Sequence, residues 1–240
     1  MKKLLYTVVL ILGLVNCLYP QDLKLGFTTG IGTYSMTGLK SINEYIPQNL
    51  PFDTELISDF PPYLYYQPTL VVKFAAFSVG LVYTFQSTGS RISAKDYSAE
   101  YRFDMKVKSH NPNIYGEFNL LSKNKYHFSV YSGAGLVFSN LEMINYFNLQ
   151  DSVVNDATNG FKAMNYYLEP GLKATYSFTP KMSAGINAGY LVQLGSKGFY
   201  EENEKENKLM DPTNYNQVKP EWDGFRFGIS LFYNIITKAK

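Results

Sequence analysis

The chain has 240 residues, of which 45% are hydrophobic, 16% aromatic and only 18% charged. Average globular proteins carry about 25% charged residues, so this composition suits a wall that faces lipid better than a surface that faces water on all sides. The formal net charge of +2 and the scattered basic residues exclude a typical nucleic-acid-binding protein, and this length predicts a single domain.

The N-terminal segment has the pattern of a secretory signal peptide. Two lysines precede an apolar run from Leu4 to Val15, and polar residues follow at Gln21. The apolar run is shorter than the roughly 20 residues that a membrane-spanning helix needs. We therefore expect residues 1–20 to be a signal peptide and residues 21–240 to form the mature domain.

Cys17 is the one cysteine of the chain. The segment from Leu14 to Cys17 resembles a lipobox, with Asn16 where a small residue is usual, so lipidation is one alternative. The other alternative is a cysteine that is removed with the signal peptide. In either case the mature chain has no internal disulfide and no multi-cysteine metal site.

Between Leu23 and Ile235 apolar and polar residues alternate with a period of two, which is typical of β-strands. Helical periodicity is nearly absent. The predicted strands lie at about 23–31, 64–74, 77–86, 97–121, 126–139, 166–178, 182–192 and 225–235.

The fourth predicted strand contains a break in its pattern. Apolar residues take the odd positions from Tyr101 to Val107 and the even positions from Ile114 onwards. Asn111-Pro112-Asn113 lies between these two parts, and a proline cannot donate a hydrogen bond to a strand ladder. We therefore expect a β-bulge at residues 111–113.

Short and long connections alternate along the predicted strands. Short turns lie near 75–76, 122–125 and 179–181, and longer segments lie at 37–63, 89–98, 141–160 and 196–223. Within the first long segment, Leu39 to Ile46 has helical spacing. Outer-membrane barrels have short periplasmic turns, long extracellular loops and an even number of strands. The pattern therefore predicts an all-β fold, an eight-stranded antiparallel up-and-down transmembrane β-barrel.

A soluble eight-stranded barrel with its apolar face inward is the alternative fold. Its outer polar face would carry many Lys and Glu residues, whereas the polar positions here are mostly Gly, Ser, Thr, Asn and Gln. Small residues fit the crowded interior of a narrow barrel. Aromatic residues also gather toward both ends of the apolar face, like the girdles of a membrane barrel. These observations favour the transmembrane arrangement.

The whole mature chain resembles the small outer-membrane β-barrel proteins, a porin-like group typified by the OmpA transmembrane domain and OmpX. The signal peptide, the alternating strands and the segment from Tyr126 to Leu136 carry this resemblance. It implies the bacterial outer membrane as the location, with outer-membrane lipid and the barrel-assembly machinery as partners. The terminal aromatic residue that often serves as the assembly signal is absent, and Phe232-Tyr233 is the candidate to replace it.

If the polar face lines the lumen, several ionisable side chains lie inside the barrel and need partners there. Counted from the periplasmic turns, Glu169 and Arg226 lie at one level, and Glu117 and Lys173 lie at another. We predict two ion pairs across the lumen from these residues. With Lys73 they form a predicted lumenal polar network that plugs the barrel. Further lumenal candidates are Arg102, Asp104, Lys106 and His127.

Signals for catalysis are weak. Asp104, Ser109 and His110 could supply an acid, a serine and a histidine, but neighbours on one strand do not form a triad without facing residues. Neither a metal-ligand spacing nor a nucleotide-binding fingerprint occurs. We therefore predict no catalytic, metal-binding or cofactor-binding residues.

Loops on a rigid scaffold commonly carry binding, so segments 37–63, 141–160 and 196–223 are the expected sites for an extracellular protein or ligand. The charged run from Glu201 to Lys208 is either a solvated loop tip or an acidic binding surface. We expect a non-enzymatic structural or surface-interaction role. Narrow-pore transport of small solutes and a membrane-embedded lipid-modifying enzyme are the alternatives.

Overall fold

The computed structural model describes residues 22–74, 77–149, 152–195 and 197–237. Its elements are β1 (Asp22–Gly32), α2 (Thr37–Gln48), β2 (Glu55–Asp59), β3 (Tyr63–Lys73), β4 (Phe77–Lys95), β5 (Ala99–Lys123), β6 (Tyr126–Leu149), β7 (Ser152–Ser177), β8 (Met182–Leu194), β9 (Tyr200–Glu201) and β10 (Gly224–Thr237). The predicted signal peptide, residues 1–20, lies outside the described residues with Cys17, so both interpretations of that segment stay predictions.

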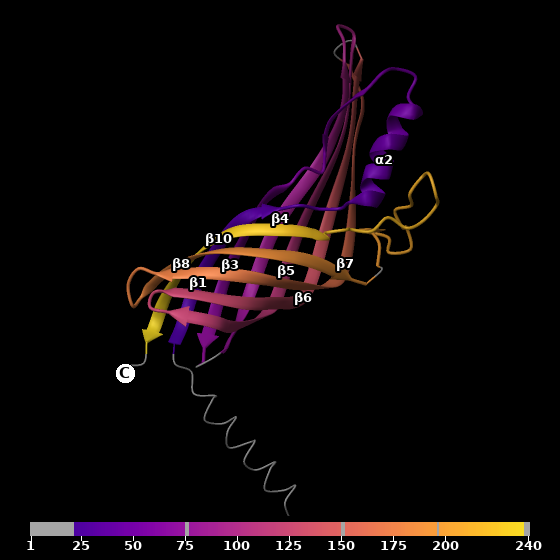
Figure 1. The fold of residues 1–240 in the computed structure, drawn as a ribbon. Helices are drawn as coiled ribbons and strands as arrows, with labels where there is room; N and C mark the ends of the chain where they lie inside the picture. The colour runs from indigo at the N-terminus through magenta and orange to yellow at the C-terminus, as the bar shows by residue number, and fades with distance from the viewer. Residues whose placement is uncertain (1–21, 75–76, 150–151, 196, 238–240) are drawn as a thin grey trace, which may run out of the picture.

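Eight antiparallel strands form a closed ring in the order β1-β3-β4-β5-β6-β7-β8-β10 (Figure 1). β10 closes the ring on β1, with Leu25 opposite Tyr233 and Gly30 opposite Gly228. Closure pairs the strand edges of the barrel wall, which lipid requires because it offers the backbone no hydrogen bonds. The predicted eight-stranded antiparallel barrel is confirmed.

The outer wall of the barrel is apolar and uncovered. Leu81, Ile186 and Ile229 point outward and are 65%, 65% and 66% exposed, whereas Thr84 and Arg226 point inward and are 0% and 1% exposed. A soluble barrel would have the opposite arrangement. The outer wall therefore faces lipid, and the protein is an outer-membrane β-barrel protein. Among the described residues, no helix is long and apolar enough to cross a membrane.

Aromatic rings lie on the outer wall at both ends of the barrel. The rings of Tyr126 and Tyr176 are 5.0 Å apart near the short turns, and those of Tyr190 and Phe225 are 4.9 Å apart near the opposite end. Such rings sit at the two interfaces of a membrane. Because short turns are periplasmic in this class, the long connections lie on the extracellular side.

Four strands, β4 to β7, continue beyond the barrel on the extracellular side (Figure 1). β5, β6 and β7 contain 25, 24 and 26 residues. The prediction of long loops at 89–98 and 141–160 is therefore wrong, because both segments belong mainly to strand hairpins. The ladders hold there because the inner face of the extension packs against the helix and the last long segment.

The β-bulge predicted at residues 111–113 is also wrong. The β4–β5 register runs without a shift from Phe77 opposite Phe118 to Lys95 opposite Glu100. The β5–β6 ladder shifts elsewhere, between Asn119 and Leu121. The odd positions of β5 face inward from Tyr101 to Asn119. The polarity of these positions changes because the inner face meets a polar lumen at the periplasmic side and an apolar core at the extracellular side.

This extracellular core, which we call the cap, joins α2, residues 197–223 and the inner face of the strand extensions. Its buried members are Tyr34, Met36, Leu39, Ile42, Phe60, Ile92, Tyr101, Phe103, Met105, Val107, Val137, Leu141, Ala163, Tyr167, Leu191, Phe199, Val218 and Trp222. Trp222 is fully buried, packs edge-on against Tyr34 at 4.9 Å and donates a hydrogen bond to Ser139 Oγ at 2.8 Å. The cap therefore covers the extracellular end of the lumen.

Residues far away in the sequence hold α2 in the cap. The helix has no side-chain N-cap of its own, and Glu221 Oε2 accepts a hydrogen bond from the Thr37 backbone N–H at 2.6 Å. A carboxylate there satisfies a free helix donor and complements the helix dipole. Asp211 Oδ1 accepts a hydrogen bond from Ser41 Oγ at 3.0 Å. The predicted helical spacing from Leu39 to Ile46 is confirmed.

Candidate functional site

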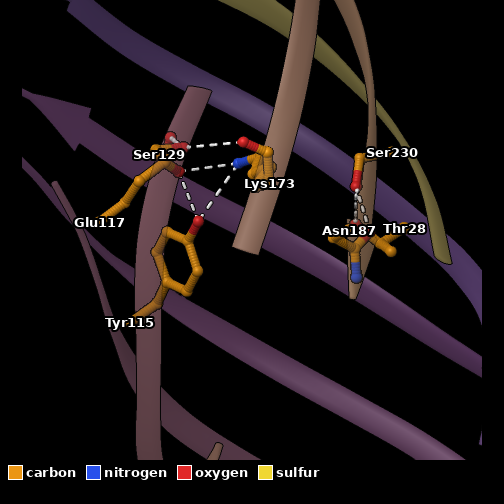
Figure 2. Close-up of polar contacts among 7 residues, drawn as sticks. All are labelled: Thr28, Tyr115, Glu117, Ser129, Lys173, Asn187 and Ser230. Carbon is orange, nitrogen blue, oxygen red and sulfur yellow. Dashed lines mark hydrogen bonds and ion pairs between the residues drawn. The ribbon is translucent and has the colours of Figure 1, made fainter. Parts of the chain in front are cut away.

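The lower polar cluster of the lumen joins β5, β6 and β7 (Figure 2). Lys173 Nζ lies 2.8 Å from Glu117 Oε2 and donates to Tyr115 Oη at 3.2 Å. Ser129 Oγ donates to Glu117 Oε1 at 2.7 Å, and the Tyr115 hydroxyl donates to the same carboxylate. Lys173 Nζ also lies 4.2 Å from the ring centre of Phe232 on β10. The carboxylate and the ammonium therefore have partners from four strands.

The upper polar cluster connects three strands across the lumen, namely β4, β7 and β10. Arg226 Nη1 lies 2.6 Å from Glu169 Oε2, and Arg226 Nη2 donates to Gln86 Oε1. The guanidinium carbon lies 5.4 Å from the ring centre of Tyr65. Arg226, Gln86 and Glu169 are buried, so each charge depends on this partnership rather than on water.

A neutral group of side chains lies on the other side of the lumen (Figure 2). Thr28 Oγ1 and Ser230 Oγ are 2.8 Å apart, Ser230 Oγ donates to Asn187 Oδ1 at 3.1 Å, and Asn187 Nδ2 donates to Tyr65 Oη at 3.3 Å. This group connects β1, β3, β8 and β10. The lumen is thus cross-linked by hydrogen bonds as well as by ion pairs.

Two small cavities remain within the lumen. The lower one measures about 40 Å³ and the upper one about 30 Å³, and all eight ring strands line each of them. Lys173 and Phe232 line both cavities, so these two side chains lie between them. An eight-stranded barrel is just wide enough for its own side chains to fill.

Glycine makes room for a ring that crosses the lumen. Gly171 on β7 and Gly189 on β8 are cross-strand neighbours, and a Cβ atom at either position would collide with the Tyr131 side chain. The Tyr131 ring lies beside Tyr115, with centres 5.6 Å apart, and its hydroxyl lies 3.5 Å from Glu169 Oε1. Tyr131 therefore links the two charged clusters.

The structure brings together both residue pairs that the sequence analysis placed across the lumen: Glu117 with Lys173, and Glu169 with Arg226. Lys73 lines the lower cavity, and it makes no ion pair with another described residue. His127 lines the same cavity.

Arg102, Asp104 and Lys106 are not lumenal, in contrast to the prediction. They lie on the outer face of the β5 extension, where Asp104 Oδ1 is 2.6 Å from Arg91 Nε and Asp104 Oδ2 is 3.4 Å from Arg102 Nε. Their position follows from the unbroken register of β5. The same register places Tyr115 and Glu117 on the inner face, so an uninterrupted count of odd positions from Tyr101 would have found Tyr115.

Gln86 and Ser129 are further lumenal partners that sequence reasoning did not assign. Both lie on the polar side of alternating strands, but their partners are set by the lateral stagger of the ring and come from distant strands. No local sequence signal indicates such a pairing.

The three residues considered for catalysis do not converge. Ser109 is fully buried on the inner side of β5, whereas His110 lies on the outer wall with its Nδ1 2.6 Å from Tyr83 Oη. Asp104 forms ion pairs with Arg91 and Arg102 on the outer face. These side chains point to opposite sides of the wall and cannot act on one substrate.

The extracellular side also has an open surface beside the cap. A groove of about 760 Å³ lies between residues 52–55 and the outer ends of β4, β5 and β6. Phe52, Tyr101 and Phe147 form its aromatic floor, with ring centres 5.6 Å apart for Phe52 and Tyr101 and 6.4 Å apart for Phe52 and Phe147. Asp53, Glu55, Lys95 and Asp96 are its charged lining residues. An aromatic floor with a mainly acidic rim suits a partner with apolar and basic groups.

Exposed apolar side chains lie on β2 and at the extracellular ends of β4, β6 and β7, and one of them, Leu149, lines the groove. They are Leu56, Ile57, Tyr97, Leu149, Val153 and Val154, with exposed fractions from 43% to 102%. The charged run from Glu201 to Lys208 is used locally, since Glu202 pairs with Lys162 and Asn207 Nδ2 donates to Glu201 Oε2 at 2.9 Å. The apolar tips are therefore the more distinctive surface.

No protein-family model matches the chain. None of the curated proteins matches it either. Solved structures with a similar fold include the outer-membrane protease OmpT from Escherichia coli (12% identity, 90% of this chain and 97% of that chain, TM-score 0.43). They also include the outer-membrane protein OprG from Pseudomonas aeruginosa (11% identity, 90% and 97%, TM-score 0.45). The attachment invasion locus protein Ail of Yersinia pestis, in complex with the heparin analogue sucrose octasulfate, is similar as well (10% identity, 89% and 99%, TM-score 0.39). At these identities and TM-scores the likenesses identify no family or activity for the chain.

Proposed function

We propose that this outer-membrane barrel is a non-enzymatic anchor that presents its extracellular cap to a protein partner. The proposal rests on the groove of about 760 Å³ with its aromatic floor, and on the exposed apolar side chains of β2 and of the neighbouring strand ends. Contiguous exposed apolar surface on a folded domain commonly marks an interaction site. The partner surface is expected to offer apolar and basic side chains to this groove.

The filled lumen supports anchoring over transport of solutes. The two lumenal cavities of about 40 and 30 Å³ each hold only a few water molecules, and the cap core covers the extracellular end. A solute would have to separate Lys173 from Glu117 and displace Phe232 to pass. Planar-bilayer recordings are therefore expected to give no steady conductance, and a reproducible conductance would favour a narrow pore.

Site-specific photo-crosslinking tests the proposed surface. Tyr97 is fully exposed beside the groove, so its replacement by a benzoyl-phenylalanine should give a discrete crosslinked species on intact cells. The same replacement at Tyr126, which is 67% exposed at the periplasmic end, is the matched control. A protein adduct that forms at Tyr97 and is absent at Tyr126 supports the proposal. Equal crosslinking at the two sites, or none at Tyr97, would contradict it.

A further inference from the structure

The periplasmic end of the lumen has a concentration of positive charge that neither the anchor role nor the two ion pairs explain. The lower cavity of about 40 Å³ lies there. Its ionisable lining residues are Lys24, Lys73, Glu117, His127 and Lys173. Three lysines and a histidine thus share a small space with one acid.

Glu117 cannot neutralise this charge. One of its carboxylate oxygens accepts from Ser129, and the other binds Lys173 and Tyr115. The acid and Lys173 therefore balance one another, and the positive charge of Lys24 and Lys73 is left over.

Lys24 on β1 and Lys73 on β3 have no acid within ion-pair distance among the residues that the structure describes. Asp22 lies opposite Lys73 in the β1–β3 ladder, but it does not line the cavity. Both lysines are half-buried, so water screens their charges less than it does at an open surface. Two like charges that share such a space repel one another unless an anion lies between them.

Neutral donors complete the wall of the cavity. Ser78 on β4 and Ser183 on β8 are 6% and 7% exposed, and Thr175 and Ser177 on β7 line the cavity beside them. The lysines come from β1, β3 and β7, and His127 on β6 adds a ring N–H donor, so donors surround the space from several directions. An oxyanion with several acceptor oxygens matches this arrangement, and lysine binds phosphate as a compact point charge.

We propose that this cavity, the periplasmic anion site, binds a phosphate oxyanion between Lys24 and Lys73. Its volume holds only a few non-hydrogen atoms, since one water needs about 10–15 Å³ on the same measure. The oxyanion is either free inorganic phosphate or the phosphate of a lipid headgroup from the periplasmic leaflet. The site is independent of the cap and of the proposed partner.

The test is a titration of purified, folded barrel in an uncharged detergent with inorganic phosphate at constant ionic strength, followed by ³¹P line width. Saturable broadening is expected for the wild type. Lys24→Gln and Lys73→Gln should each weaken the apparent affinity by about tenfold, because each removes a charged donor. Lys125→Gln is the matched control, since Lys125 lies at a neighbouring periplasmic turn and does not line the cavity.

A second arm distinguishes the two sources. A short-chain phosphatidylglycerol, added below its micelle concentration, should displace inorganic phosphate if the headgroup is the ligand and leave it bound if free phosphate is the ligand. Either outcome supports the site, provided that the two lysine variants lose it and Lys125→Gln keeps it. Absence of saturable broadening in the wild type, or an unchanged affinity in both lysine variants, would overturn the proposal.

Discussion

Arg226 and Glu169 show how a narrow barrel accommodates charge. Both side chains are nearly inaccessible to water, and their atoms Nη1 and Oε2 are 2.6 Å apart. Burial of either charge alone costs several kcal/mol, so the pair stabilises the barrel only as long as both partners remain. The predicted cost of losing one partner is therefore much larger than the net contribution of the pair.

Glu169→Gln is expected to destabilise the barrel by about 3–5 kcal/mol, because it leaves the Arg226 charge buried without a counter-ion. The measurement is the urea concentration at which half of the protein has lost the band that the folded barrel gives in electrophoresis without boiling. Glu142→Gln is the control, since Glu142 lies 3.7 Å from Lys108 with both side chains about half exposed. That surface pair is expected to contribute less than about 1 kcal/mol. Equal midpoints for the two variants would contradict the role of the buried pair.

A second residue-scale prediction concerns the glycine beside Tyr131. Gly171→Ala places a methyl group where the Tyr131 ring lies, and overpacking of this kind costs about 1–3 kcal/mol. Gly116→Ala is the matched control, because a Cβ atom there meets only the Ser132 carbonyl oxygen at 3.9 Å. Adding Tyr131→Leu should recover part of the loss at position 171. If both alanine variants unfold at the same urea concentration, the close packing of Tyr131 is not a constraint.

At the scale of elements, α2 depends on residues about 180 positions further along the chain. The Glu221 carboxylate accepts a hydrogen bond from the first turn of α2, with Oε2 2.6 Å from the Thr37 backbone nitrogen. Trp222 is the single Trp of the chain. It follows Glu221 in the sequence and is fully buried. Tryptophan fluorescence therefore reports on the extracellular cap alone, while heat modifiability reports on the barrel.

Glu221→Ala should lower the stability of the cap by about 1 kcal/mol, since the helix loses its N-terminal acceptor. The red shift of Trp222 emission is expected at a lower urea concentration, with the barrel transition unchanged. Glu206→Ala, in the exposed charged run, serves as the control. A parallel shift of both transitions would mean that the cap and the barrel unfold as one unit.

Acid should loosen the cap through Asp211. Desolvation raises the pKa of this carboxyl, but hydrogen bonds from the Thr213 N–H and the Ser41 hydroxyl outweigh it and hold the pKa below its ordinary value of 3.8. A lowered folded-state pKa stabilises the fold above the ordinary value, and that contribution is lost as the pH falls through the folded pKa. Trp222 emission should therefore shift to the red below about pH 4.

Asp211→Asn should remove most of this pH dependence from the cap. Asp96, at the β4–β5 tip, also has a lowered pKa because the Ser98 and Ala99 N–H groups and the Ser98 hydroxyl donate to it. Its hydrogen-bond partners in the described part of the chain are Ser98 and Ala99 rather than α2, so Asp96→Asn should leave the acid response of Trp222 intact. An identical response in the Asp211→Asn variant and the wild type would rule out Asp211 as its source.

At the scale of the whole molecule, alternation with a period of two was enough to predict the ring, its lipid-facing wall and its short turns. The levels of Glu117, Glu169, Lys173 and Arg226 could be counted from those turns because residues on a strand rise by a constant distance. The extracellular strand extensions could not be recognised in the same way. In the extension of β5, the apolar residues from Tyr101 to Val107 take the odd positions and face inward onto the cap core. From the sequence alone, this alternation cannot be distinguished from that of a lipid-facing wall.

Labelling of single cysteines with a membrane-impermeable maleimide tests most directly whether the barrel is sealed below an extracellular cap. Val153, which is 59% exposed at the β6–β7 tip, and Thr84, which is fully buried in the lumen, are the two positions to replace. The parent chain, whose one cysteine is Cys17, sets the background. Val153→Cys is predicted to react on intact cells, and Thr84→Cys is predicted to react only after the barrel is unfolded by boiling. Rapid reaction of Thr84→Cys in the folded barrel would contradict the account, since it would require an open, water-filled lumen.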